Sequence, residues 1–176
     1  MEKNQCIILV GYMGSGKSSV SGALRSISGL PFLDTDEEIA RRAGKTVSAI
    51  FAEEGEEAFR AMETRLLQEL IDQKWKGVLS TGGGMPVREE NRRLLKQLGT
   101  VIYLKTSPET ICKRLEGDTT RPLLAGLTDR SAKLQKIREM LEKRQGFYEE
   151  ASQITVNTDG RTTDAIAREI LTAAKP

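Results

Sequence analysis

The chain has 176 residues, 38% hydrophobic and 30% charged, a balance typical of one ordinary globular domain with a single core. With 27 basic and 25 acidic residues the net charge is +2, which is too balanced to argue for nucleic acid or a membrane surface as a partner, and we expect neither. The chain has no histidine, which excludes histidine-based acid–base chemistry, and no apolar run approaches the roughly 18 residues of a membrane span. We expect one domain over 1–176, free thiols at Cys6 and Cys112, no signal peptide before the first strand, and a cytoplasmic location.

The first predicted elements are a strand over 6–10 and a helix over 18–28, joined by a glycine-rich turn. The turn, Gly11-Tyr-Met-Gly-Ser-Gly-Lys-Ser18, matches the phosphate-binding pattern G-x4-G-K-[ST]. Glycines let the backbone curl around an anion, and the helix N-terminus and Lys17 add positive charge, while the Ser18 hydroxyl suits Mg²⁺. The stretch predicts a nucleoside triphosphate site formed by Gly14, Ser15, Gly16, Lys17, Ser18 and Ser19.

A short strand predicted over 31–33 runs into Asp34-Thr-Asp36, which places two carboxylates at the end of a strand. Carboxylates at that position suit hydroxyl groups or a metal ion. Asp36 is also the candidate N-cap of a helix predicted over 37–43, a role that fits Asp34 less well.

A short helix over 46–51 precedes a longer helix over 55–72, whose apolar stripe carries Glu63. Arg60 lies three residues before Glu63, so the two side chains can meet. Either Glu63 braces Arg60 so that the guanidinium can hold an anion, or the two form a surface ion pair at the edge of the stripe. The periodicity favours neither interpretation.

The strand predicted over 77–80 leads into Gly82, Gly83 and Gly84, and a helix is predicted from Pro86 to about Leu98. Consecutive glycines cost backbone entropy, so a use is expected for them. We interpret them as a close approach of the backbone to a ligand, with a flexible turn as the alternative.

Further along, the segment 117–128 has glycine near both ends and a central arginine, Arg121, which suggests a mobile lid over a triphosphate site. Arg144 continues the buried face of a long charged helix and therefore needs an anionic partner. The remaining predicted elements are strands over 100–104 and 152–156 and helices over 107–115, 129–147 and 162–174.

Strands and helices alternate throughout, which predicts an α/β fold with a five-stranded parallel sheet flanked by helices on both faces. In such sheets ligands bind at the carboxyl ends of the strands. The phosphate-binding loop, Asp34, Asp36 and the glycines at 82–84 should therefore share one edge of the sheet.

In this order and spacing, the motifs resemble those of the shikimate kinases, within the nucleoside monophosphate kinase-like P-loop proteins. The resemblance covers nearly the whole chain. Its carriers are Gly11-Tyr-Met-Gly-Ser-Gly-Lys-Ser18, Phe32-Leu-Asp34-Thr-Asp36, Phe59-Arg60 with Glu63, Ser80-Thr-Gly-Gly-Gly84, Arg121-Pro-Leu-Leu124, and Arg144 with Tyr148.

The resemblance implies transfer of the γ-phosphoryl group of ATP to the 3-hydroxyl of shikimate, with Mg²⁺. It implies that Asp34 holds the ring hydroxyls and acts on the attacking one. It also implies that Arg60 and Arg144 grip the carboxylate, with Glu63 bracing Arg60. The backbone of the turn at 82–84 would line the acceptor pocket.

On the nucleotide side, the resemblance implies that Arg121 swings from the lid toward the phosphates. Arg114 would stack on adenine, helped by the turn at 158–161, and Lys17 would keep its phosphate role. Mg²⁺ would be held by Ser18 and, through water, by Asp36. We expect a monomer, because the sequence shows no additional apolar helix face that would need to be covered by a partner chain.

Three alternatives are weighed against this function. Another small-metabolite kinase of the same architecture, such as a gluconate kinase, would share the phosphate-binding loop. A nucleoside monophosphate kinase is disfavoured, since Asp34, Arg60 and Arg144 suit a hydroxylated acid better than a base and a phosphate. A nucleotide-dependent switch without turnover is disfavoured by Lys17, Asp34 and Arg121.

Overall fold

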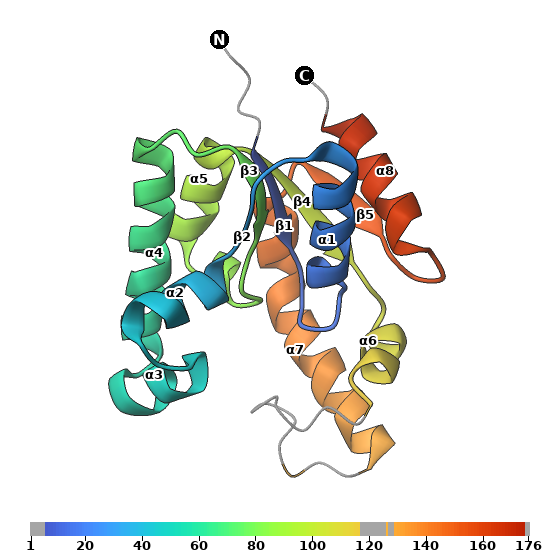
Figure 1. Ribbon diagram of the computed structural model, residues 1–176. Coiled ribbons are helices and arrows are strands. Elements are labelled where there is room, and N and C mark those ends of the chain that lie inside the picture. Colours follow the sequence, from blue (N-terminus) through green and yellow to red (C-terminus); the bar gives the residue numbers. More distant parts are fainter. Residues whose placement is uncertain (1–5, 117–125, 127–128, 175–176) are drawn as a thin grey trace.

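The computed structural model describes residues 6–116, 126 and 129–174, and in this part of the chain the strands form one parallel sheet (Figure 1). The strand order is β2-β3-β1-β4-β5, so β1 is the central strand. Because all the strands are parallel, their carboxyl ends lie along the same edge of the sheet. The strands are β1 (Cys6–Val10), β2 (Phe32–Asp34), β3 (Gly77–Ser80), β4 (Thr100–Lys105) and β5 (Ile154–Asn157).

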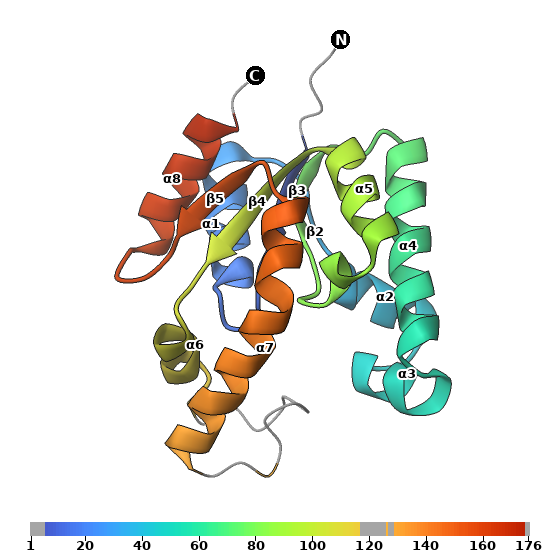
Figure 2. The same ribbon diagram turned by 180° about the vertical axis from the view of Figure 1, so that it is seen from behind.

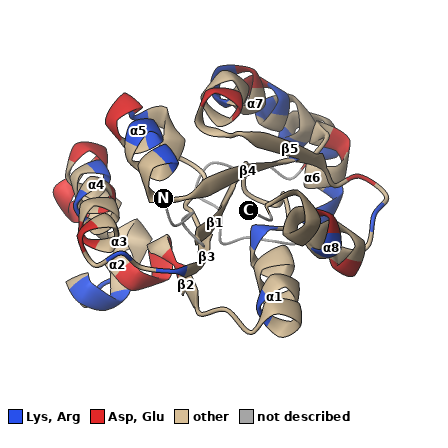
Figure 3. Ribbon diagram, turned by 90° about the horizontal axis from the view of Figure 1, so that it is seen from above, with Lys and Arg blue, Asp and Glu red and all other residues tan. Residues whose placement is uncertain are grey.

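Helices cover both faces of the sheet, with α1 and α8 on one side and α4, α5 and α7 on the other (Figure 2 and Figure 3). Acidic and basic residues are interspersed on the outer helices (Figure 3). The helices are α1 (Lys17–Ser28), α2 (Thr35–Ala43), α3 (Val47–Glu54), α4 (Glu56–Asp72), the 3₁₀ helix η1 (Met85–Val87), α5 (Glu89–Leu98), α6 (Pro108–Arg114), α7 (Arg130–Ala151) and α8 (Thr163–Ala173).

The central strand shows why the sheet is buried on both faces. Ile8 and Val10 point into the core shared with α4, α5 and α7, whereas Ile7 and Leu9 point into the core shared with α1 and α8. The apolar run of β1 is continuous because successive side chains alternate between two apolar layers. The predicted fold class is confirmed. Cys6 and Cys112 are free and buried, as predicted.

One predicted boundary is wrong. Pro86 does not open the helix that ends at Leu98, because it lies in η1, and α5 begins only at Glu89. Arg88 between them has extended backbone, with φ −79° and ψ 126°. Among the described residues, no helix is both long and apolar enough to cross a membrane.

Candidate active site

The carboxyl ends of β1, β2 and β3 border a cleft of about 550 Å³, where ligands of parallel sheets bind. The phosphate-binding loop and the start of α1 line it on one side, and residues after β5 line it on another. Asp34 and Ser80, the last residues of β2 and β3, are paired in the sheet register. The cleft gathers most of the predicted site residues, namely Gly14, Ser15, Gly16, Lys17, Ser18, Ser19, Asp34, Asp36, Gly82, Gly83 and Arg114.

The phosphate-binding loop has the geometry that its glycines allow. Gly14 and Gly16 have φ of 75° and 93°, and Gly16 is the N-cap residue of α1. The Lys17 ammonium donates to the carbonyl oxygens of Gly11 at 2.7 Å and Tyr12 at 3.1 Å, which holds its charge against the loop. The lysine and the positive end of α1 therefore face the same cleft, an arrangement that favours a phosphate group.

Asp34, and not Asp36, caps α2. Its Oδ1 accepts hydrogen bonds from the backbone N–H groups of Asp36 at 2.9 Å and Glu37 at 3.1 Å. The alternative role of Asp36 as the cap is wrong, because the helix begins at Thr35, earlier than the apolar pattern indicates. The cap fixes the Asp34 carboxyl group at the edge of the cleft, where it can act on a ligand hydroxyl.

Two glycines of the run after β3 pack closely against charged side chains, and the third faces the backbone of the phosphate-binding loop with Arg144 nearby. A methyl group at Gly82 would lie 3.1 Å from Cγ of Asp36, with an oxygen of that carboxylate closer still. At Gly83 it would lie 3.9 Å from an Nη of Arg144, and at Gly84 2.7 Å from Cζ of Arg60. The run therefore brings together side chains of α2, α4 and α7. The need for glycine at positions 82 and 84 is steric, since neither has a positive φ; at position 83 a methyl group would make only ordinary contacts.

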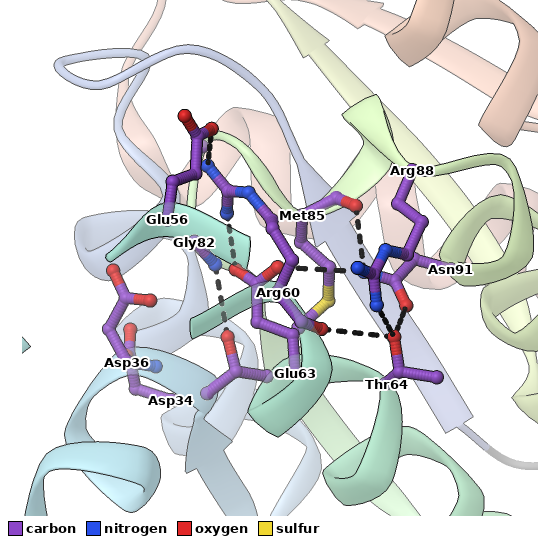
Figure 4. A network of polar contacts seen from close by, with 12 residues as sticks. Asp34, Asp36, Glu56, Arg60, Glu63, Thr64, Gly82, Met85, Arg88 and Asn91 are labelled. Carbon is purple, nitrogen blue, oxygen red and sulfur yellow. Dashed lines mark hydrogen bonds and ion pairs between the residues drawn. The ribbon is translucent and has the colours of Figure 1, made fainter. Parts of the chain in front are cut away.

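Arg60 and Glu63 form a buried ion pair, so the surface alternative is wrong. Arg60 Nη1 lies 2.8 Å from Glu63 Oε1, and the two side chains are 9% and 0% exposed (Figure 4). Phe51 and Phe59 flank the guanidinium, with ring centroids 5.8 Å and 5.6 Å from its Cζ. Glu56 reaches the same guanidinium at 3.4 Å from the exposed side. These contacts hold the Arg60 guanidinium in one orientation, so it can bind a carboxylate in a defined geometry.

Arg144 approaches the same turn from α7. Tyr148, one helical turn further on, donates its hydroxyl to the carbonyl oxygen of Gly83 at 2.6 Å, which ties α7 to the glycine run. Burial raises the pKa of Tyr12 and the positive charge of Arg144 opposes that rise, so this phenol also lies near the guanidinium. Sequence reasoning missed Tyr12, because an aromatic residue at a variable loop position carries no pattern.

The other side of the cleft offers groups for a nucleotide base. Arg114 Nη1 donates to the carbonyl oxygen of Gly14 at 3.1 Å, which places this guanidinium beside the phosphate-binding loop. Thr158 and Arg161, in the turn after β5, line the cleft nearby. The lid predicted at 117–128 and its Arg121 lie outside the described residues, apart from Gly126.

Comparison with known proteins identifies the family. The family model described as shikimate kinase matches residues 13–175. The chain belongs to the shikimate kinase family. The shikimate kinase of Histophilus somni is 43% identical over 171 residues, which cover 97% of this chain and 95% of that protein. The shikimate kinase of Legionella pneumophila (strain Corby) is 44% identical over 165 residues, 94% of this chain and 91% of that protein.

Among solved structures, the chain is similar to the shikimate kinase from Acinetobacter baumannii in complex with shikimate. The TM-score is 0.86 and the identity 40%, over 98% of this chain and 93% of the other. The predicted family is therefore confirmed. Sequence reasoning also missed Thr35, which in this shikimate kinase family member accepts a hydrogen bond from the Gly82 N–H at 3.0 Å. Its only sequence signal is a small hydroxyl between two aspartates.

The buried carboxyl group of Glu63 should make stability depend on pH. Burial raises its pKa from 4.5 to about 7, although Arg60 and Arg144 oppose the rise and Asp36 adds to it. Between these two pKa values the folded state keeps a proton that the unfolded state has lost. The stabilisation is thus complete below about pH 4.5 and is lost as the pH rises through 7.

We expect the unfolding temperature of the wild type, measured against Glu63→Gln, to fall as the pH is raised from 5 to 7.5. Glutamine has the same shape and does not titrate, so the difference between the two proteins isolates this carboxyl group. Thermal unfolding followed by circular dichroism at half-unit pH steps measures it. A difference that stays constant across this range would contradict the prediction.

A methyl group at Gly84 should displace the Arg60 guanidinium, because Cβ and Cζ would lie 2.7 Å apart. We expect Gly84→Ala to raise the KM for the acceptor by about tenfold or more and to leave the KM for ATP unchanged. Steady-state kinetics in both substrates measures this. Gly22→Ala on α1 is the matched control, since a Cβ there meets nothing within 4 Å. An unchanged acceptor KM would show that Arg60 can move without loss.

Proposed function

We propose that the chain transfers the γ-phosphoryl group of ATP to the 3-hydroxyl of shikimate. The observation that carries the proposal is the position of the glycine run. Gly82 and Gly83 line the cleft that also holds Lys17 and Asp36, and Arg144 lies near Gly83. Gly84 packs against the guanidinium group of Arg60, which lines a separate hollow with Glu56 and Arg88. The cleft and the charged side chains behind its glycine run thus offer groups for a phosphate donor and for a hydroxylated acid.

On the donor side, the backbone of residues 14–19 and the Lys17 ammonium would bind the phosphates of ATP. Catalysis of phosphoryl transfer depends on positioning and on neutralising charge, so it needs no histidine. Arg114 would contact the adenine base, supported by its place beside Gly14. Arg121 would approach the phosphates from the predicted lid over 117–128.

On the acceptor side, Asp34 would accept hydrogen bonds from the ring hydroxyls and orient the one that attacks. Its cap bonds restrict its rotamer, which favours orientation over proton transfer alone. Arg60 and Arg144 would bind the carboxylate, and the backbone at 82–84 would line the pocket. Guanidinium groups suit this task because they present paired donors to a planar carboxylate.

Mg²⁺ would be held by the Ser18 hydroxyl and, through water, by Asp36. Both line the cleft, and oxygen ligands are those that Mg²⁺ prefers. Among the described residues, no group of three or more cysteine, aspartate or glutamate side chains is arranged to hold a metal ion. Mg²⁺ commonly binds one or two carboxylates and completes its shell with phosphates and water. When bound, the ion would neutralise charge on the phosphates.

We also propose that the protein acts as a monomer in the cytoplasm, with ATP and shikimate as its partners and neither nucleic acid nor membrane involved. The free, buried state of Cys6 and Cys112 suits a reducing compartment.

Coupled ADP release with shikimate, gluconate and nucleoside monophosphates tests the proposal. We expect turnover with shikimate and at least about a hundredfold lower kcat/KM with the others, since neither presents a hydroxyl group and a carboxylate at the fixed spacing of the shikimate ring. Higher kcat/KM with gluconate would favour the small-metabolite alternative, and no turnover with any acceptor would favour the nucleotide-dependent switch. Sedimentation of the purified chain with and without ATP tests the monomer.

A further inference from the structure

Asn91, in the first turn of α5, is a polar side chain with no exposed surface. A buried amide is costly unless its donors and acceptor are paired. It lies behind the acceptor side of the cleft, in the network of Figure 4, and the roles given to the residues on the cleft do not account for it.

The amide of Asn91 connects α4 with the turn that follows the glycine run. Its Nδ2 donates to the carbonyl oxygen of Met85 at 3.1 Å and lies 3.5 Å from Oε2 of Glu63. Its Oδ1 accepts from the Thr64 hydroxyl at 2.6 Å (Figure 4). Because a carbonyl oxygen can only accept, the bond to Met85 settles which end of the amide carries the nitrogen.

The 3₁₀ helix η1 has all of its carbonyl oxygens held by two adjacent residues of α5. Asn91 binds the first, and Arg92 Nη1 donates to the second and third, on Pro86 and Val87, at 2.9 Å each. Arg92 is anchored in turn to α7, with Glu150 at 3.3 Å and the Phe147 ring centroid at 4.9 Å. Asn91 is instead anchored to the Arg60–Glu63 pair.

These contacts close a ring. Arg60 pairs with Glu63, Glu63 lies against Asn91, Asn91 binds Met85, and Met85 follows Gly84, on whose Cα the Arg60 guanidinium packs. We propose that Asn91 is a positioning residue that holds Glu63, and through it Arg60, in register with Gly84. This inference rests on the proposed function, because Arg60 matters as a ligand for the acceptor carboxylate.

The charges around Glu63 make this position sensitive. Arg60 from α4 and Arg144 from α7 favour its ionised form, whereas Asp36 from α2 opposes it. Asn91 adds a neutral donor from α5. Aspartate at this position would put an oxygen opposite both Oε2 of Glu63 and the Met85 carbonyl, so contact would require a shared proton.

The test compares Asn91→Asp and Asn91→Ser with the wild type in steady-state kinetics. We expect the KM for shikimate to rise on the order of tenfold in both, with kcat and the KM for ATP within about twofold of the wild type. In Asn91→Asp the rise should grow from pH 6 to pH 8, as the shared proton is lost. In Asn91→Ser it should not change over this range.

Arg92→Gln is the matched control, since it loosens the same turn without contacting Glu63. A double-mutant cycle with Glu63→Gln supplies the decisive readout. If Asn91 acts through Glu63, Asn91→Ser should raise the KM far less in the Glu63→Gln background than in the wild type. A purely structural role would give additive effects.

The outcomes separate the two proposals. Wild-type protein that does not turn over shikimate would overturn the proposed function. An active wild type beside an unchanged KM in Asn91→Ser, or an equal rise in Arg92→Gln, would overturn the role of Asn91 alone. If Asn91→Asp fails to fold, Asn91→Ser and its double-mutant cycle with Glu63→Gln are sufficient to test the role of Asn91.

Discussion

Replacing Asp34 with asparagine should leave ATP binding intact and lower kcat by about 10²- to 10³-fold. Asparagine caps a helix as well as aspartate does, so the two bonds to Asp36 and Glu37 should survive and α2 should keep its position. The substitution therefore removes the negative charge while the fold is retained. Initial rates of ADP release, with nucleotide affinity measured by fluorescence titration, separate the two effects.

Asp34→Ala provides the control, because it removes the cap as well as the charge. It should unfold at a lower temperature than Asp34→Asn, by an amount equivalent to about 1 kcal/mol, with a similar loss of kcat. Retained turnover in Asp34→Asn would remove Asp34 from the chemistry and leave it as a cap.

An acceptor that lacks its carboxylate should lose about 10- to 150-fold in kcat/KM with the wild type and much less with an Arg60→Ala variant. The reason is that the carboxylate and the guanidinium stabilise each other, so either deletion alone removes the interaction. Arg60→Ala would leave the buried Glu63 carboxyl group without its cationic partner, which is destabilising. The variant should therefore be made together with Glu63→Gln.

Glu63→Gln alone is the reference for the double variant Arg60→Ala with Glu63→Gln. Arg144→Ala tests the second guanidinium group and should raise the KM for the acid. Equal losses in the wild type and in the Arg60 variant, for the acceptor without its carboxylate, would show that Arg60 does not bind this group.

The local sequence pattern was sufficient to predict the phosphate-donor half of the cleft. The strand, loop and helix from Cys6 to Ser28 are contiguous in the chain, so spacing alone predicts where Lys17 lies. The sheet followed from the alternation of strands and helices. Which aspartate caps α2 did not follow, because Asp34 and Asp36 both satisfy the residue preference and only the actual helix start distinguishes them.

The acceptor half depends on contacts between distant segments. Periodicity put Glu63 near Arg60 but could not decide whether the pair was buried, which depends on Phe51, Phe59 and α5. Asn91 was missed for the same reason. The sequence pattern predicts that a single asparagine in a charged helix is exposed. Only the contacts with Met85 and Glu63 in the folded chain show that Asn91 is buried.

The glycine run has a consequence for the spacing of the two charged side chains that pack against its ends, Asp36 and Arg60. Consecutive Cα atoms are about 3.8 Å apart, so Gly82 and Gly84 are separated by no more than about 7 Å. The side chains that rest on them are therefore spaced by covalent geometry and not by how closely α2, α4 and α7 happen to pack. Small shifts of those helices, from surface substitutions or from temperature, should alter the distance between the Asp36 carboxylate and the Arg60 guanidinium very little.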